Sequence, residues 1–300
     1  MIDGDATPER RIVRRTLWGR WIGAAAVVVF LAWVLFQILT NKGFQWSIVG
    51  TYLLDPEILA GVRTTVELTV LVMAVGIVIG LVLAIMKLSG DPVMSLAASG
   101  YIWFFRGTPV LVQLVFWYNL AAIFPLLSLG VPFGGPKFLS VSSTVAISSF
   151  TAALLGLGLN EGAYMAEIFR SGIIAVDKGQ TEAAKALGYR PLQTMMVIIL
   201  PQAMTSIVPP TGNQVIGMLK YSSLASVVAL PELMEAASNI YSRNFETIPL
   251  LIVASLWYLA MTTVLSIGQY FIERYCDEER NVSGVAFRRS AGTRLSFPGG

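Results

Sequence analysis

The sequence has 300 residues, of which 55% are hydrophobic and only 13% carry a charge, and its formal net charge is +3. A soluble domain is less apolar and about twice as rich in charge, so these proportions exclude a soluble protein and predict an integral membrane protein. The chain has no histidine and a single cysteine, Cys276, which excludes a Ser-His-Asp catalytic triad and an intrachain disulfide. We expect no metal site, no cofactor and no nucleic-acid partner.

The chain begins with a basic arm and a long apolar run. Residues 1–20 form the arm, and its arginines are Arg10, Arg11, Arg14, Arg15 and Arg20. Residues 21–39 are long enough to cross a bilayer, and positive charge holds the preceding terminus in the cytoplasm. A cleaved signal peptide is the alternative, but residues 39–42 lack the small-residue cleavage pattern.

Further apolar segments of spanning length follow, separated by polar connections. They lie at about 61–87, 93–124, 141–174, 192–219 and 249–270. With the first span they predict an all-α membrane protein with six crossings and both termini in the cytoplasm. The connection at 125–140 is predicted to be an outside loop, and residues 220–247 are predicted to form two short helices at the outer face. Residues 276–300 are predicted to be a disordered, arginine-rich cytoplasmic tail.

The second of these segments contains a helix breaker. In Phe105-Arg106-Gly107-Thr108-Pro109 the proline cannot donate a backbone hydrogen bond and the glycine weakens a helix interior. One interpretation is broken backbone at membrane depth, which is tolerated where it lines a cavity. The other is an interfacial connection with Arg106 at the cytoplasmic head groups.

A short polar helix is predicted between the fourth and fifth spans. Asp177 can cap its N-terminus, with Gln180 reaching back, and residues 178–187 are rich in helix formers. Gly188 suits a left-handed stop, and Pro191 suits the first turn of the next helix. At roughly 15 Å the helix is too short and too polar to cross the bilayer, so we expect it in the cytoplasm.

The spacing in this stretch is that of a known motif. Glu182-Ala183-Ala184 is followed after three residues by Gly188 and, after nine more residues, by Ile198-x-Leu200-Pro201. This resembles the EAA loop of ABC importer permeases, whose short helix couples the membrane subunit to the ATPase. The resemblance implies that Glu182, Ala183, Ala184 and Gly188 serve this coupling. An ordinary loop helix between two spans is the alternative.

Three further stretches resemble the amino-acid branch of these permeases. They are residues 105–113 (FRGTPVLVQ), 163–173 (AYMAEIFRSGI) and 200–224 (LPQAMTSIVPPTGNQVIGMLKYSSL). The resemblance covers about 61–275, which would be the permease domain, and leaves out the first span and both basic tails. It implies a multi-pass subunit of the cytoplasmic membrane that moves a polar amino acid or an opine-like relative.

The resemblance also implies partners. They are two ATP-binding cassette ATPase subunits, a second permease half formed by the same or a related chain, and an extracellular or periplasmic solute-binding protein. The chain has no G-x-x-x-x-G-K-[ST] phosphate loop, so it should not hydrolyse ATP itself and is not expected to be an enzyme.

Polar residues inside the apolar segments are candidates for the solute path, because such groups are costly in a membrane and usually face a cavity or a partner. They are Gln113, Asn160, Glu161, Asn213, Gln214, Lys220, Ser222 and Ser223. An amino-acid zwitterion needs an anion, a cation and amide hydrogen bonds, and this set supplies all three. Alternatively, the amides bridge helices and Glu161, Glu167 and Arg170 form a surface network, in which Glu167 and Arg170 can pair.

Two other functions compete with this interpretation. A secondary transporter could use an ion gradient through Glu161 or Glu167, but it would not need the coupling stretch. A membrane-embedded enzyme is disfavoured because histidine is absent and no nucleophile motif is recognisable.

Overall fold

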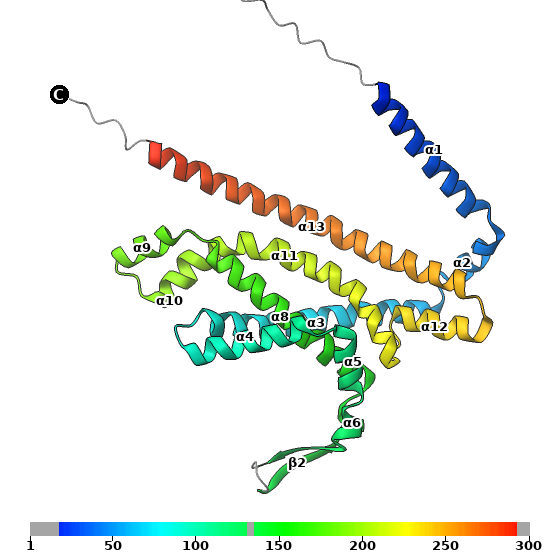
Figure 1. The fold of residues 1–300 in the computed structure, drawn as a ribbon, viewed down its shortest axis with the longest axis horizontal. Coiled ribbons are helices and arrows are strands. Elements are labelled where there is room, and N and C mark those ends of the chain that lie inside the picture. Colours follow the sequence, from blue (N-terminus) through cyan, green and yellow to red (C-terminus); the bar gives the residue numbers. More distant parts are fainter. Residues whose placement is uncertain (1–17, 131–134, 293–300) are drawn as a thin grey trace, which may run out of the picture. The chain divides into compact units, whose positions relative to one another are not determined.

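The computed structural model describes residues 18–130 and 135–292, which are almost entirely helical (Figure 1). The chain divides into two compact units, residues 1–48 and 49–300. Most of the predicted basic arm, residues 1–17, lies outside the described residues, as does the end of the tail, residues 293–300.

The elements in chain order are α1 (Trp18–Thr40), the 3-10 helix η1 (Lys42–Phe44), α2 (Trp46–Tyr52), α3 (Pro56–Leu88), α4 (Pro92–Gly107), α5 (Val110–Tyr118), α6 (Leu120–Ile123), β1 (Leu126–Gly130), β2 (Lys137–Ser142), α7 (Ser143–Ala146), α8 (Ser149–Ile174), α9 (Lys178–Ala186), α10 (Pro191–Gln193), the π-helix η2 (Thr194–Ile199), α11 (Leu200–Tyr221), the 3-10 helix η3 (Ser222–Val228), α12 (Leu233–Asn244) and α13 (Thr247–Gly292).

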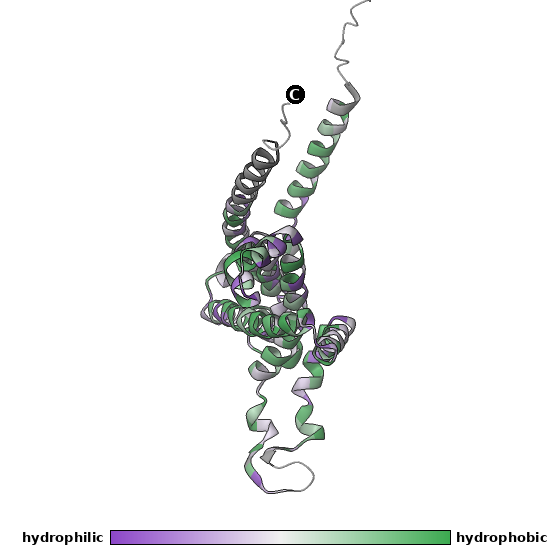
Figure 2. Ribbon diagram, turned by 90° about the vertical axis from the view of Figure 1, so that its left-hand side faces the viewer, coloured by the Kyte–Doolittle hydropathy of each residue, from purple (hydrophilic) through white to green (hydrophobic). Residues whose placement is uncertain are grey.

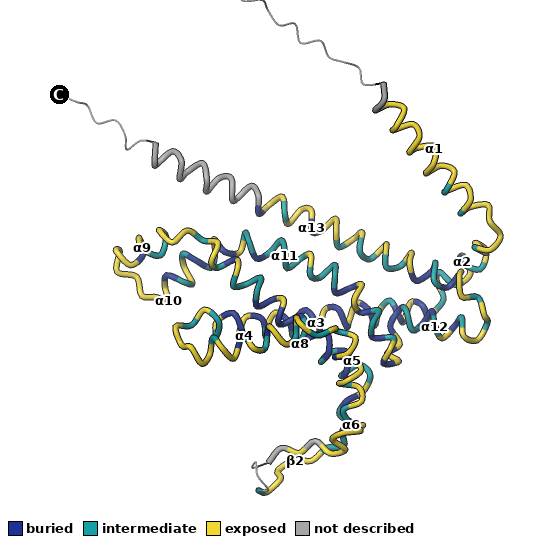
Figure 3. Tube along the Cα trace, viewed as in Figure 1, coloured by how far each residue is buried: buried dark blue, intermediate teal, exposed yellow. Residues whose placement is uncertain are grey.

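Helix α1 is an isolated apolar helix within the first unit. It is exposed along nearly its whole length (Figure 3) and mostly hydrophobic (Figure 2). Its 23 residues rise about 35 Å, enough to cross a bilayer. Lipid is the natural environment for such a surface, as expected for the predicted first span.

Among the residues that the structure describes, four helical segments are long and apolar enough to span a membrane. They are Trp21–Thr40, Pro56–Leu88, Pro191–Val228 and Thr247–Cys276. The other two predicted crossings differ from these. The break after Gly107 leaves α4 and α5 individually short, and α8 has sufficient length but carries small and polar residues that lower its hydropathy. The count of six therefore remains a prediction.

The centre of the second unit is the packing of α3 against α8. Glycines spaced four apart on both helices let the backbones approach closely, as in membrane helix pairs generally. A Cβ atom at Gly80 would lie 2.5 Å from Met165 Cβ, and one at Gly162 would lie 2.6 Å from Ile79 Cγ2. Helix α8 is consequently mostly buried or half-buried, with Leu157 fully buried, whereas α3 alternates between buried and exposed residues (Figure 3).

A buried carboxylate joins three helices at the end of the bundle opposite α9 (Figure 1). Glu232 is fully buried and caps α12 by accepting from the Glu235 backbone N–H at 2.9 Å. It also accepts from the Tyr258 hydroxyl of α13 at 2.7 Å and from the Thr65 hydroxyl of α3 at 3.4 Å. Burial raises the pKa of Glu232 above its ordinary value. The predicted pair of short helices in this region is thus confirmed as η3 and α12.

Two parts of the fold differ from prediction. The expected loop at 125–140 contains an antiparallel hairpin in which Leu126 pairs with Ser142 and Ser128 with Ser140. Strand formers such as Phe138 and Val141 flank its turn-rich sequence, and the helical pattern of the rest of the chain masked them. Residues 131–134 at its tip lie outside the described residues.

The second difference is at the C-terminus, where disorder was predicted from residue 276. Helix α13 instead continues to Gly292 over 46 residues, roughly 69 Å. The sequence ERYCDEER after Phe271-Ile272 contains no proline or glycine, and each residue added to an existing helix gains a hydrogen bond without a new nucleation cost.

Candidate functional site

The break between α4 and α5 has a specific cause and specific compensation. Pro109 has no N–H, so the Phe105 carbonyl lacks its helical donor four residues on. Asn160 Nδ2 donates to that oxygen at 2.6 Å, and Gln113 Nε2 donates to it at 3.1 Å. Broken backbone inside the bundle is therefore satisfied by amide side chains, and the predicted discontinuity is confirmed.

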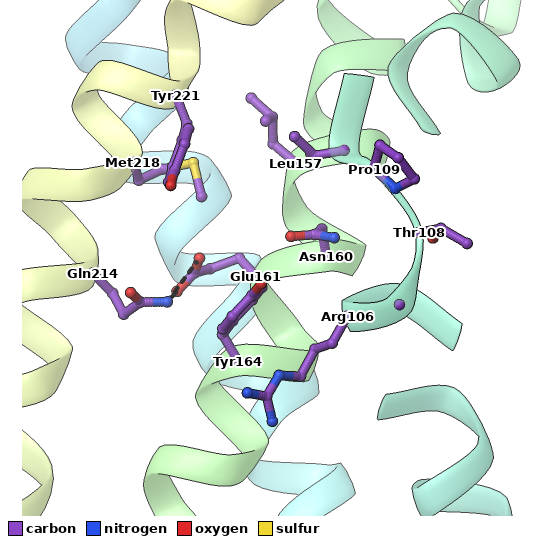
Figure 4. A pocket seen from close by; sticks show the side chains of 12 residues that line it. Arg106, Thr108, Pro109, Leu157, Asn160, Glu161, Tyr164, Gln214, Met218 and Tyr221 are labelled. Atoms are coloured by element: carbon purple, nitrogen blue, oxygen red, sulfur yellow. Dashed lines mark hydrogen bonds between the residues drawn. The ribbon is translucent and has the colours of Figure 1, made fainter. Parts of the chain in front are cut away.

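The break forms one wall of a cavity of about 390 Å³, with α8 and α11 as the other walls (Figure 4). Its lining residues are Arg106, Gly107, Thr108, Pro109, Val110, Leu157, Asn160, Glu161, Tyr164, Gln214, Met218 and Tyr221. Of the two interpretations of the break, the structure favours the cavity wall over the interfacial connection.

Glu161 is the acidic group of this cavity. Its side chain is only 3% exposed, and Gln214 Nε2 of α11 donates to its carboxylate at 3.1 Å, the dashed line in Figure 4. Behind it, Gly76 of α3 leaves room for the carboxylate, since a Cβ there would lie 2.7 Å from Glu161 Cγ. Within residues 18–130 and 135–292, none of the ion pairs involves Glu161. A buried carboxylate held only by a neutral amide can accept a cationic group.

Arg106 is the basic group of the cavity. Its guanidinium carbon lies 5.0 Å from the ring centroid of Tyr164, which stands one helical turn below Glu161 on α8 (Figure 4). The contact is a cation–π interaction, which holds the guanidinium without neutralising it. The cavity thus contains an anion, a cation and amide groups in one space.

Three of the predicted path residues, Asn160, Glu161 and Gln214, come together in the cavity. The other five do not line it. Gln113 is buried behind the wall, and Asn213 and Lys220 are exposed elsewhere on α11. The hydroxyls of Ser222 and Ser223 donate to the backbone oxygens of Leu219 and Lys220, both at 2.7 Å.

Sequence reasoning missed several lining residues, and helical spacing was the signal that could have found them. Leu157, Asn160 or Glu161, and Tyr164 fall three or four apart on α8, and so do Gln214, Met218 and Tyr221 on α11. Residues at such spacings share one helix face. Lys220 falls outside this spacing, and Arg106 is the cation that lines the cavity instead.

An ionic network lies apart from this cavity, further along α8. Glu167 pairs with Arg170 at 2.7 Å, as the sequence suggested, and also with Lys87 of α3 at 2.6 Å. Glu161 does not belong to this network. The two carboxylates of α8 therefore differ, because one is paired with cations and the other faces the cavity.

The short polar helix is present as α9. Asp177 caps it by accepting from the Gly179 N–H at 2.6 Å, and Gly188 stops it with φ +82°. One detail was wrong: Gln180 does not reach back to the cap, because its side-chain oxygen accepts from Gln202 of α11 at 3.4 Å. Of the motif residues, Glu182 and Ala183 are exposed. Ala184, the third motif residue, is buried.

A π-helix, η2, connects α10 to α11. The six residues of η2 end at Ile199, and the N–H of the next residue, Leu200, donates to the Met195 carbonyl five residues back. Helix α11 begins at Leu200 with Pro201 in its first turn and continues through Pro209 and Pro210. Gln269 of α13 donates to the Pro209 oxygen at 2.8 Å.

Comparison with known proteins points to one family. The family model described as binding-protein-dependent transport system inner membrane component matches residues 76–276. The arginine transport system permease protein of Corynebacterium glutamicum is 46% identical over 264 residues, covering 87% of this chain and 81% of that protein. The glutamine transport system permease protein of Escherichia coli K12 is 32% identical over 231 residues, covering 77% and 97%.

The fold is similar to that of a solved transporter. A crystal structure of an amino acid ABC transporter with histidines matches at a TM-score of 0.62 and 37% identity, covering 73% of this chain and 94% of that one.

Proposed function

Since the chain belongs to the family of binding-protein-dependent transport system inner membrane components, we propose that the cavity around Glu161 is where its solute passes. The chain is a multi-pass permease subunit of an ATP-binding cassette importer in the cytoplasmic membrane, and its solute is a polar amino acid. ATP hydrolysis belongs to a separate subunit.

The chemistry of the cavity suits an α-amino acid. Glu161 is positioned to accept a solute ammonium, displacing the amide of Gln214 from the carboxylate. Arg106 can leave the Tyr164 ring to meet the solute carboxylate. The carboxylate of Glu161, buried without a cation among the described residues, is the single observation that carries this assignment.

The partners of the chain follow from its family. An importer of this kind needs ATPase subunits, a solute-binding protein and a second permease half. We propose two ATPases and two permease halves, with α9 as the part that docks on the ATPase. The exposed Glu182 and Ala183 and the sharp turn at Gly188 support this role for α9.

A gradient-driven carrier is the other candidate, and family membership disfavours it. The observation in favour of such a carrier is the same buried carboxylate of Glu161, because a protonatable group at membrane depth could also couple transport to protons. ATP-driven uptake with all ionic gradients collapsed separates the two functions.

The experiment is uptake of a panel of labelled amino acids into proteoliposomes that hold the assembled complex, its binding protein and enclosed ATP. Glu161→Gln removes the charge at nearly constant shape, so uptake should fall at least tenfold while the amount of assembled complex stays unchanged. Glu67→Gln on the exposed side of α3 is the matched control and should transport normally. If Glu161→Gln reduces the amount of assembled complex but leaves uptake per complex unchanged, Glu161 is structural and the path lies elsewhere.

A further inference from the structure

Gln113 is a buried amide that the proposed solute path leaves without a role. Its side chain is 6% exposed and lies behind the cavity wall. Its Nε2 donates to the Phe105 oxygen at 3.1 Å, to the Thr108 oxygen at 3.2 Å and to Thr108 Oγ1 at 2.7 Å. All three acceptors belong to the broken segment between α4 and α5.

One of these acceptors, the Phe105 carbonyl, lacks the donor that a continuous helix would give it. The helical partner of the Phe105 carbonyl would be the N–H of Pro109, which does not exist. A carbonyl left without a donor away from water is destabilising. Gln113, in the first turn of α5, reaches back over the break to supply one donor to this oxygen, and Asn160 supplies another.

Gln113 is also connected to the cavity through Asn160. Asn160 Nδ2 donates to the Phe105 oxygen at 2.6 Å and to Gln113 Oε1 at 3.4 Å. Asn160 precedes Glu161 on α8, so this set of bonds ties the broken segment to the helix that carries Glu161. On the opposite wall, the Gln214 side chain of α11 donates to the Glu161 carboxylate.

We propose that Gln113 is a positioning residue: acting through Asn160, it fixes the α4–α5 break as the rigid wall of the cavity without touching the solute. The position of Arg106 and Thr108 relative to Glu161 then depends on Gln113. The inference rests on the proposed function of the cavity, but its test needs no solute.

The test is the rate at which single cysteines react with a water-soluble thiol reagent in membranes containing the assembled complex. Gly107→Cys reports on the broken segment, because a Cβ at Gly107 meets nothing within 4 Å. Tyr221→Cys reports on the α11 wall of the same cavity, where Tyr221 is 58% exposed. Both are made in a Cys276→Ser background.

Gln113→Met keeps the size of the side chain and removes its donors. We expect the labelling rate at position 107 to change at least threefold, the rate at 221 to stay within experimental error, and the amount of complex to be unchanged. Adding Asn160→Leu to Gln113→Met should change the rate at 107 little further, because the two residues act as one unit. Gln37→Met, at an exposed glutamine of α1, is the matched control and should change neither rate.

Two results would overturn the proposal. Unchanged labelling at 107 in Gln113→Met would mean that the break is held without Gln113. Equal changes at 107 and 221, together with loss of complex, would mean that Gln113 serves only general folding. Either result can occur while Glu161→Gln still abolishes uptake, so the failure of this inference is distinguishable from failure of the proposed function.

Discussion

Gly80 and Gly100 are two helical glycines with opposite surroundings. A Cβ at Gly80 would meet Met165 Cβ at 2.5 Å and the Ala166 backbone nitrogen at 2.9 Å, whereas one at Gly100 would meet nothing within 4 Å. Gly80→Ala must therefore separate α3 from α8, and overpacking of this kind typically costs about 1 to 3 kcal/mol. Gly100→Ala replaces a glycine inside a helix by a residue that loses less backbone entropy on folding, so it should be neutral or stabilise the fold by up to about 1 kcal/mol.

The measurement for this pair is the apparent melting temperature of the purified complex in detergent. Gly80→Ala should melt clearly below the parent complex, and Gly100→Ala at or above it. Equal melting temperatures for the two variants would contradict the close α3–α8 contact.

The polarity of single residues predicted some of the residues that line the cavity. Their spacing along each helix, which decides the face they share, would have removed the wrong ones. Glu161 and Gln214 stood out because charged and amide groups are costly in an apolar segment. The same criterion also selected Lys220 and Ser223, which point elsewhere, because cost alone does not say which helix face a residue occupies. Arg106 was ambiguous until the break was seen to line a cavity.

At the scale of single elements, α9 tests the coupling assignment. Gly188 ends it with φ +82°, a conformation that a β-branched side chain resists. A Cβ there would meet nothing within 4 Å, so any effect of Gly188→Val arises from backbone strain rather than from crowding. We expect the Gly188→Val variant to bind the ATPase more weakly or to show ATP-driven uptake at least tenfold below that of the parent complex.

The measurement is uptake per assembled complex, with ATPase retention on a tagged permease as the second readout. Gly100→Ala, a glycine substitution outside α9, is the control and should retain both. Normal uptake and normal ATPase retention in Gly188→Val would count heavily against α9 as the coupling helix.

Local chemistry predicted some elements well and others poorly. The cap at Asp177 and the stop at Gly188 were readable, since capping and positive φ depend on a few neighbouring residues. The hairpin and the long α13 were not, because strand pairing joins distant residues and helix continuation depends on the preceding turns. The π-helix η2 also had no distinct sequence signal beyond the proline that follows it.

At the scale of the whole molecule, the arrangement of the second unit bears on its orientation. In Figure 1, α9 and α10 lie at the end of the bundle where α3 leads into α4, and α12 lies at the other end. Lys87 near the end of α3 and the basic residues around α9 predict that the former end is cytoplasmic by the positive-inside rule. The buried Glu232, with its partners Thr65 and Tyr258, would then lie toward the outer face.

This orientation gives the last prediction, the membrane topology. Between Ser140 and Gly188 the one long helix is α8, whose 26 residues rise about 39 Å and suffice for a single crossing. Reporter fusions after these two positions should therefore lie on opposite sides, with alkaline phosphatase active after Ser140 and a fluorescent protein bright after Gly188. Fusions after Leu88 and after Phe245 calibrate the two sides, since they follow α3 on the expected inside and α12 on the expected outside. If the Ser140 and Gly188 fusions report the same side, α8 does not cross the membrane and the six-span topology is wrong.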